Sequence, residues 1–149
     1  MARKTFTPAE AEFIGQERVL RFNSSSGGGD IHSVPICFAF DGTNFYAHAR
    51  KPDAKRWRNV KGNPSVSLEL DSYSDDWSQL KGVLVHGKAE FLDSGPDHDL
   101  GLRLLKEKYH QYREGASALS SGVPVVRVVP TRVTNWYLGG SAVSRPGPR

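Results

Sequence analysis

Short runs in which apolar and polar residues alternate recur along the chain, and they constrain its fold more than any other feature. In the clearest run, Val66, Leu68 and Leu70 alternate with serine and acidic residues, as in a strand with one buried face. Turn signals separate the runs. Asp41-Gly42 is a strong hairpin signal, and Ser24–Asp30 is expected to form a flexible turn without regular structure. We therefore expect six or seven strands, within residues 18–22, 31–40, 44–49, 65–71, 83–91, 123–129 and 132–138.

Two prolines bear on the arrangement of these strands. A proline cannot donate a hydrogen bond to a neighbouring strand, so Pro35, inside the second run, is expected at a bulge or a sheet edge. Pro130 separates the last two runs, which we therefore expect as two strands.

Two short helices are expected. Thr7, Pro8 and Glu10 form a capping-box signature at the start of the first, because the hydroxyl and the carboxylate can each accept a backbone N–H. The second would begin at Asp53 and end at Gly62-Asn63-Pro64, where glycine and proline stop a helix.

The longest helix is expected from Pro96 to about Arg113, with Gly115 as its stop. Its apolar residues recur at three- and four-residue steps, which predicts one buried face. These residues are Leu102, Leu105, Tyr109 and Tyr112. Six or seven strands with one crossover helix and two minor helices predict a mainly β protein, an antiparallel barrel or sandwich with accessory helices.

The length and the cysteine count limit the remaining possibilities. A chain of 149 residues is long enough for one domain; we expect it over residues 1–138, with a flexible tail at residues 139–149. Cys37 is the sole cysteine and is expected to be a buried thiol, without a disulfide or a thiolate metal site. The sequence has no run of roughly 20 apolar residues and no signal-peptide core. These features predict a cytoplasmic protein that has no membrane partner.

A basic segment is the most informative feature for function. The motifs of zincins, P-loop proteins and α/β-hydrolases are absent, and the five histidines are scattered. Between Arg50 and Lys61, by contrast, six lysines and arginines accompany one acid, Asp53. Such a block favours an anionic partner, such as a phosphate, a nucleotide, a polyanionic tail or nucleic acid.

The same segment has the pattern of an amphipathic helix. The apolar positions would share one face and the basic positions another: Ala54, Trp57 and Val60 on the first, and Lys51, Lys55 and Arg58 on the second. Helix N-termini and arginine side chains both suit phosphate oxygens. The pattern is equally typical of a surface helix whose charges are solvated.

Several motifs in a fixed order carry a resemblance to a known family. They are Val34-Pro35-Ile36-Cys37-Phe38, Phe45-Tyr46-Ala47-His48, Lys55-Arg56-x-Arg58-Asn59-Val60-x-x-Asn63-Pro64-x-Val66-Ser67-Leu68 and Val85-x-Gly87-x-Ala89-Glu90. Through them, the chain from about Phe13 to Trp136 resembles the pyridoxamine 5′-phosphate oxidase-like split-barrel superfamily. Two further stretches resemble its deazaflavin-dependent oxidoreductase branch: Asp71-x-Tyr73-x-Asp75-Asp76-Trp77-Ser78 and Lys108-Tyr109-x-Gln111-Tyr112.

The resemblance implies a fold, a cofactor and a partner. The fold would be a six- to seven-stranded antiparallel split β-barrel of Greek-key type, as in FMN-binding split barrels. Two chains would pair as a homodimer, and FMN or the deazaflavin coenzyme F-420 would lie in a groove at their interface. Trp77 and Ser78 match the branch motif near the flavin-like ring, on which an aromatic side chain can stack.

The resemblance also implies that the basic residues before Asn63-Pro64 hold the cofactor phosphate. Counting back from Asn63-Pro64 selects Arg56 and Arg58, whereas counting from Ala54 selects Lys55, so all three are candidates. The full set of candidate cofactor-binding residues is Pro35, His48, Arg50, Lys51, Lys55, Arg56, Arg58, Trp77 and Ser78.

The leading hypothesis is a flavin- or deazaflavin-dependent oxidoreductase that transfers a hydride between the cofactor and a small organic substrate. In such enzymes the cofactor carries the chemistry and the protein positions it. The alternatives are a cofactor carrier without turnover, a haem-binding split barrel and a nucleic-acid binder. The longer C-terminal segment by which pyridoxamine-phosphate oxidases recognise their substrate is not evident, so that activity is not assigned.

Overall fold

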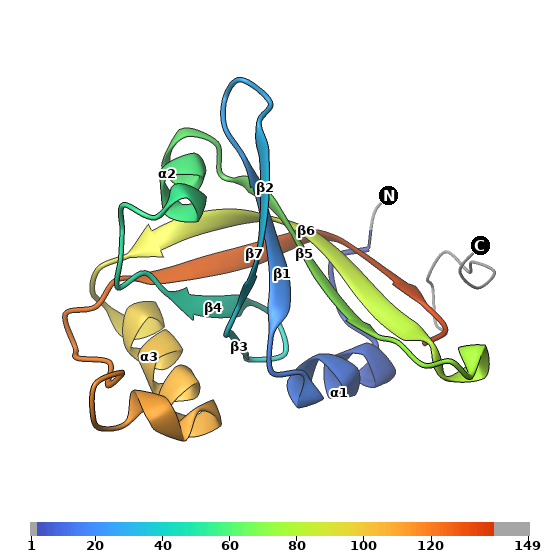
Figure 1. Cartoon of the computed structure of the whole chain (residues 1–149). Coiled ribbons are helices and arrows are strands. Elements are labelled where there is room, and N and C mark those ends of the chain that lie inside the picture. Colours follow the sequence, from blue (N-terminus) through green and yellow to red (C-terminus); the bar gives the residue numbers. More distant parts are fainter. Residues whose placement is uncertain (1–2, 139–149) are drawn as a thin grey trace.

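The computed structural model describes residues 3–138, which form one antiparallel sheet with helices around it (Figure 1). The strand order is β2-β1-β5-β6-β7-β4-β3. The strands are β1 (Leu20–Ser25), β2 (Ile31–Ile36), β3 (Ala39–Phe40), β4 (Phe45–His48), β5 (Ser65–Ser72), β6 (Lys81–Leu92) and β7 (Val125–Trp136). The helices are α1 (Pro8–Gln16), α2 (Lys55–Gly62) and α3 (Pro96–Lys108), with short 3₁₀ turns η1 (Trp77–Gln79) and η2 (His110–Tyr112). None of these helices is long and apolar enough to cross a membrane.

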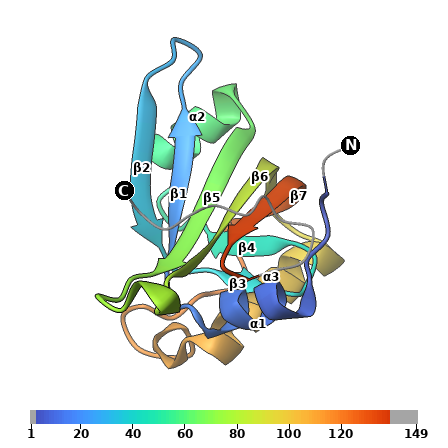
Figure 2. The ribbon, with the colours of Figure 1, turned by 90° about the vertical axis from the view of Figure 1, so that its right-hand side faces the viewer.

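The connection between β2 and β3 forces the sheet to curl. These strands form the two edges of the sheet, yet only Cys37 and Phe38 join them. Seven flat strands would separate the edges by roughly 29 Å at about 4.8 Å per strand, whereas the three Cα–Cα steps of the connection span at most about 11 Å. The sheet therefore wraps round on itself into a curled half-barrel (Figure 2). This confirms the predicted mainly β, antiparallel split-barrel fold.

A bulge lets β6 and β7 bend without breaking. The prediction of two final strands separated by Pro130 is wrong, because Val125–Trp136 is one continuous strand. Pro130 pairs with Gly87 at a register shift that leaves Thr131 without a partner residue on β6. A proline is tolerated at such a point. A side chain at Gly87 would bring a Cβ within 2.7 Å of the Val129 carbonyl oxygen, so the close approach of the strands requires glycine.

The observed first hairpin differs in detail from the expected one. The expected flexible turn at residues 24–30 is too long, because Ser24 and Ser25 belong to β1. The buried Ser24 hydroxyl accepts a hydrogen bond from Asn59 of α2 at 3.1 Å, which extends the strand under that helix. Pro35 lies in the edge strand β2, as expected, but the break in the run 31–40 falls at residues 37–38.

Two helix boundaries also differ from the expected ones. Residues 51–54 form a turn in which the Ala54 N–H donates to the Lys51 carbonyl, so α2 begins at Lys55 rather than at Asp53. The last helix ends at Lys108, well before Arg113, because Tyr109 is extended. The four apolar residues predicted for its buried face are nevertheless all buried: Leu102, Leu105, Tyr109 and Tyr112.

The strand β4 is buried on both sides, which explains its apolar sequence. Phe45 and Ala47 belong to the core inside the half-barrel, together with Val66, Leu68 and Leu70 of β5, whose burial confirms their predicted alternation. Tyr46, between them, points to the opposite face and packs in a second core with α3. A Cβ at Gly101 of α3 would lie 2.9 Å from the Tyr46 ring, so this helix packs closely on the outside of the strand.

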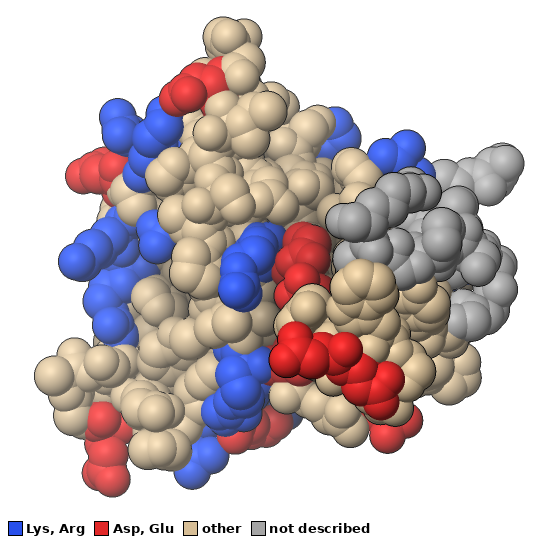
Figure 3. Space-filling model, turned by 45° about the vertical axis from the view of Figure 1, so that its right-hand side comes forward, with Lys and Arg blue, Asp and Glu red and all other residues tan. Residues whose placement is uncertain are grey.

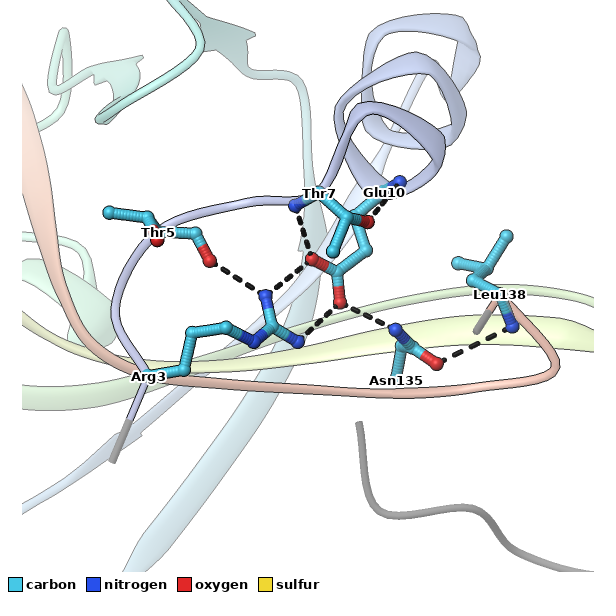
Figure 4. A network of polar contacts seen from close by, with 6 residues as sticks. All are labelled: Arg3, Thr5, Thr7, Glu10, Asn135 and Leu138. Carbon is cyan, nitrogen blue, oxygen red and sulfur yellow. Dashed lines mark hydrogen bonds and ion pairs between the residues drawn. The ribbon is translucent and has the colours of Figure 1, made fainter. Parts of the chain in front are cut away.

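The N-terminal segment is fastened to the sheet by the buried carboxylate of Glu10 (Figure 4). The predicted capping box is present, with Thr7 and Glu10 each accepting the other's backbone N–H. The same carboxylate accepts hydrogen bonds from Arg3 at 2.6 and 2.8 Å and from Asn135 of β7 at 2.6 Å. Burial alone would raise the pKa of Glu10, but the hydrogen bonds from Arg3, Asn135 and Thr7 outweigh it and lower the pKa.

Replacement of Glu10 by alanine is expected to lower the free energy of unfolding by about 3 kcal/mol, because it leaves Arg3 and Asn135 without their shared acceptor. Glu12→Ala, at an exposed position of the same helix, should change it by less than about 0.5 kcal/mol. Urea unfolding followed by tryptophan fluorescence measures both values. Because the pKa of Glu10 is lowered on folding, the deficit of the Glu10→Ala variant should shrink as the pH falls below about 4. A deficit equal to that of Glu12→Ala would contradict the structural role.

Candidate functional site

A pocket of about 260 Å³ lies where the two edges of the curled sheet come near each other. The strand β3 pairs with only Phe45 and Tyr46 of β4, so the edge of β4 beyond them is open. The end of β2, the link after it, α2 and the loop before α2 close around this opening. The residues that line the pocket are Pro35, Ile36, Cys37, Ala47, His48, Arg50, Lys51, Arg56 and Trp57.

The lining of the pocket is positively charged. It includes Arg50, Lys51 and Arg56, and none of its nine residues is acidic. Lys and Arg side chains gather along the side of the molecule that carries α2 (Figure 3). A concave surface that concentrates one sign of charge attracts ligands of the opposite sign. The pocket therefore suits an anionic group.

Arg56 lines the pocket and also has an unsatisfied buried nitrogen. Its Nε atom is buried and has no hydrogen-bond partner among the described residues. The next residue, Trp57, is buried against Phe22 with ring centroids 5.2 Å apart, which anchors α2 and fixes the side of the helix that faces the pocket. An unsatisfied buried donor costs roughly 1–3 kcal/mol. Arg56 lines the pocket, where its guanidinium can pair with an anionic oxygen.

His48 enters the pocket as a neutral hydrogen-bond donor. The backbone N–H of Arg50 donates to its Nδ1 at 3.3 Å, which assigns the ring proton to Nε2. Burial, followed by the positive charges of Arg50 and Arg56, lowers the pKa of His48 to about 4. The edge of the ring packs against Tyr112 with centroids 5.2 Å apart. His48 therefore adds a donor to the pocket without adding a charge.

Arg50 has a second role in addition to its charge. Its guanidinium donates to the carbonyl oxygens of Ser117 and Ala118 at 2.6 and 2.8 Å. These bonds tie the loop after η2 to the pocket wall. Arg50 thus contributes positive charge from a side chain that is already held in place.

The other two candidates on α2 lie outside the pocket. Lys55 forms an ion pair with Asp30 of the β1–β2 turn, with Nζ 3.0 Å from Oδ2. Arg58 is exposed, and neither residue lines the pocket. The Asn63-Pro64 motif, which selected Arg58 together with Arg56, has a structural role, because the Asn63 side chain accepts the Ser65 N–H and the Pro64 carbonyl accepts the Ala89 N–H.

Trp77 and Ser78 are far from the pocket within one chain. They lie in η1, at the turn between β5 and β6, on the side of the molecule opposite α2 in both ribbon views (Figures 1 and 2). Ser78 bonds to the Asp76 carboxylate at 2.7 Å, and the indole N–H of Trp77 donates to the Tyr73 hydroxyl at 3.4 Å. The Trp77 side chain is 54% exposed and that of Tyr73 is 67% exposed. The chain thus presents an exposed aromatic pair remote from its basic pocket.

Sequence reasoning missed part of the pocket. Cys37 was expected to be a buried thiol, but it is partly exposed at the pocket wall. Ile36 and Ala47 line the pocket as well, and Ser117 and Ala118 orient Arg50 from about 70 residues further along the chain. No local pattern indicates such a long-range contact. No group of three or more metal-ligating side chains occurs within residues 3–138.

Solved structures share this fold at low sequence identity. A FAD-binding protein of Mesorhizobium loti is 23% identical, with 91% of this chain and 96% of that chain covered and a TM-score of 0.66. HutZ, the haem storage protein of Vibrio cholerae, is 16% identical, with coverages of 87% and 93% and a TM-score of 0.69. An F420 reductase is 17% identical, with coverages of 83% and 94% and a TM-score of 0.63.

No curated protein matches the sequence. The family model of pyridoxamine 5′-phosphate oxidase, however, matches residues 6–137. That match includes every strand, the whole pocket and η1. The chain therefore belongs to the pyridoxamine 5′-phosphate oxidase family.

Proposed function

We propose that the protein binds the phosphate group of a flavin-type cofactor in the basic pocket and uses that cofactor to transfer a hydride to or from a small organic substrate. The observation that carries the proposal is a pocket lined by Arg50, Lys51 and Arg56 and by no acidic residue. A family match and flavin-binding neighbours of the same fold support the choice of cofactor class.

The residues of the pocket fit a phosphate. Arg56 and Lys51 would donate charge-assisted hydrogen bonds to it, Arg50 would add positive charge, and His48 would donate from Nε2. Pro35 would bound the pocket from β2. A bound flavin would supply the hydride chemistry itself, and the protein would position it and shield it from water.

The size of the pocket favours a site shared between two chains. Pockets that enclose a whole cofactor-sized ligand measure roughly 300–1,000 Å³, and this pocket measures about 260 Å³. It would therefore hold the phosphate end and leave the ring system exposed. In a homodimer, the exposed Trp77 of a second copy would cover the ring, with Ser78 beside it. This arrangement gives a function to an aromatic pair that lies far from the pocket of its own chain.

Haem binding is the alternative suggested by HutZ. A histidine that ligates a metal through Nε2 normally donates its other ring N–H to an acceptor. The Nδ1 of His48 instead accepts a hydrogen bond from Arg50, which keeps the proton on Nε2. His48 is therefore prepared to donate to an anion and not to ligate iron.

Arg56→Ala should weaken FMN binding by about ten- to a hundredfold, because a hydrogen bond to a charged group contributes about 1.5–3 kcal/mol. Arg58→Ala, on the outer side of the same helix, is the matched control and should change it by less than about threefold. Fluorescence titration of FMN gives both affinities. Equal losses in the two variants would place the phosphate elsewhere on α2.

Lys55 and Arg58, two cations of α2 that lie outside the pocket, should instead distinguish between FMN and a deazaflavin as the cofactor. A deazaflavin with a long anionic tail would extend beyond the pocket towards Lys55 and Arg58, whereas FMN would not. The double variant Lys55→Ala, Arg58→Ala is thus expected to lose affinity for coenzyme F-420 by about tenfold, or ~1.4 kcal/mol, and to keep its affinity for FMN. Unchanged binding of both would remove these two residues from the site.

His48 should remain neutral between pH 5 and 8 and gain its proton only near pH 4, which NMR of its ring resonances can follow. Because the pKa is lowered on folding, the stability associated with neutral His48 is present above the unfolded value of about 6.5 and is lost as the pH falls towards 4. Arg56→Gln removes one repelling charge and should raise the pKa. Titration near pH 6.5, or a haem absorption shift that His48→Ala abolishes, would contradict the proposed donor role.

A shared site can be tested by mixing two inactive variants. Arg56→Ala lacks the pocket donor and Trp77→Ala lacks the ring cover, so neither homodimer should bind cofactor tightly. A heterodimer of the two would contain one site with both defects and one intact site. After unfolding and refolding of an equimolar mixture, about a quarter of all sites should recover, because half of randomly paired dimers are mixed. Refolding each variant alone is the control. No recovery from mixed dimers that are shown to form would refute the shared site.

A further inference from the structure

The segment Lys108–Tyr112 carries one of the family motifs, and its first residue is in an unusual position. Lys108 is the last residue of α3, and its side chain is only partly exposed. Its Nζ atom lies 3.6 Å from the centroid of the Phe38 ring and 5.4 Å from that of Tyr109. The amine thus rests on aromatic faces at the base of the link between β2 and β3.

The charges around this amine do not compensate for its burial. Lys108 has no ion pair with any carboxylate in residues 3–138. Arg18 lies on the same cluster, with its guanidinium 4.7 Å from the centroid of the Tyr109 ring and hydrogen-bonded to the Lys108 carbonyl at 3.0 Å. A half-buried amine beside a second cation holds its proton less tightly than an exposed amine does. The aromatic faces attract a cation, but they replace only part of the lost hydration.

These surroundings lower the pKa of the Lys108 amine. Burial, and then the charge of Arg18, lower the pKa of its amine to about 8, against weaker opposing effects of Cys37 and Glu17. Near neutral pH, an appreciable fraction of this amine is therefore unprotonated. Only the unprotonated form has the lone pair that attacks an electrophile.

We propose that Lys108 is a modification site, at which its amine accepts an acyl group from activated carboxylic acids such as acyl phosphates. The nitrogen lone pair would attack the carbonyl carbon and form the C–N bond. The C–O bond to phosphate would break, phosphate would leave with its electron pair, and the amine would release a proton to water. No atom changes oxidation state, and the side chain becomes a neutral amide against Phe38. The proposal does not depend on cofactor binding.

The surroundings give this modification a structural consequence. The hydroxyl of Tyr109, the next residue, accepts the Phe38 N–H at 3.1 Å and lies 2.5 Å from the Arg18 carbonyl oxygen. The link that carries Phe38 also carries Cys37, which lines the basic pocket. An acyl group on Lys108 would therefore lie against Phe38, next to the pocket-lining residue Cys37.

The test is competitive acylation of the folded protein with acetyl phosphate at less than one equivalent per lysine. Peptide mass spectrometry then gives the modified fraction at each of the eight lysines. At pH 7.5 Lys108 should react about tenfold faster than Lys106 of the same helix, because its lower pKa leaves more of the amine unprotonated. The rate of acylation of Lys108 should rise with pH and level off above about pH 8. This measurement needs only the wild-type protein.

The matched variant is Arg18→Gln, which removes the neighbouring cation. It should slow the labelling of Lys108 severalfold at pH 7.5 and leave that of Lys106 unchanged. If the variant does not fold, the pH profile of the wild-type protein decides the question. Equal rates at Lys108 and Lys106, or a Lys108 rate that continues to rise above pH 10, would overturn the proposal.

Discussion

The two-residue connection between the edges of the sheet is the constraint on which the rest of the structure depends. Since Cys37 and Phe38 must join strands that are the first and last of seven, the sheet cannot lie flat. Its curl creates an interior that is filled by alternating side chains and an opening where β3 is too short to cover β4. Tyr109 binds the backbone of Phe38 from outside and holds the connection in place.

The basic pocket is a consequence of the same opening. Its walls come from β2 and β4, which lie near opposite edges in the order of the sheet and meet only because the sheet curls. The helix α2 closes the opening because its apolar side is buried in the barrel core, with Trp57 against Phe22. That burial leaves Arg56 in the lining of the pocket. Hydrophobic packing thus provides the energy that holds a charged side chain in an otherwise unfavourable position.

The chain also separates two features that the proposed flavin site requires. Positive charge lies beside α2, and the exposed aromatic pair Tyr73 and Trp77 lies at the far turn of β5 and β6. A second copy of the chain would bring the two features together, and a twofold axis would do so at two equivalent sites.

The sequence by itself determined the class of fold and the family, and it predicted an anionic partner. Alternation placed the buried face of β5, the capping box placed α1, and the basic block indicated an anion, because each signal is local. The tertiary structure decided which residues carry out these roles. Arg56 and Arg58 are only two positions apart, but about 200° separates them around a helix, so only one can face the pocket, and the docking of Trp57 determines which. Likewise, Pro130 looked like a strand boundary until Gly87, on the neighbouring strand, was seen to form a bulge with it. The hydrogen bonds that hold Arg50 and the packing of Lys108 on Phe38 both depend on contacts between distant segments, which no local pattern encodes.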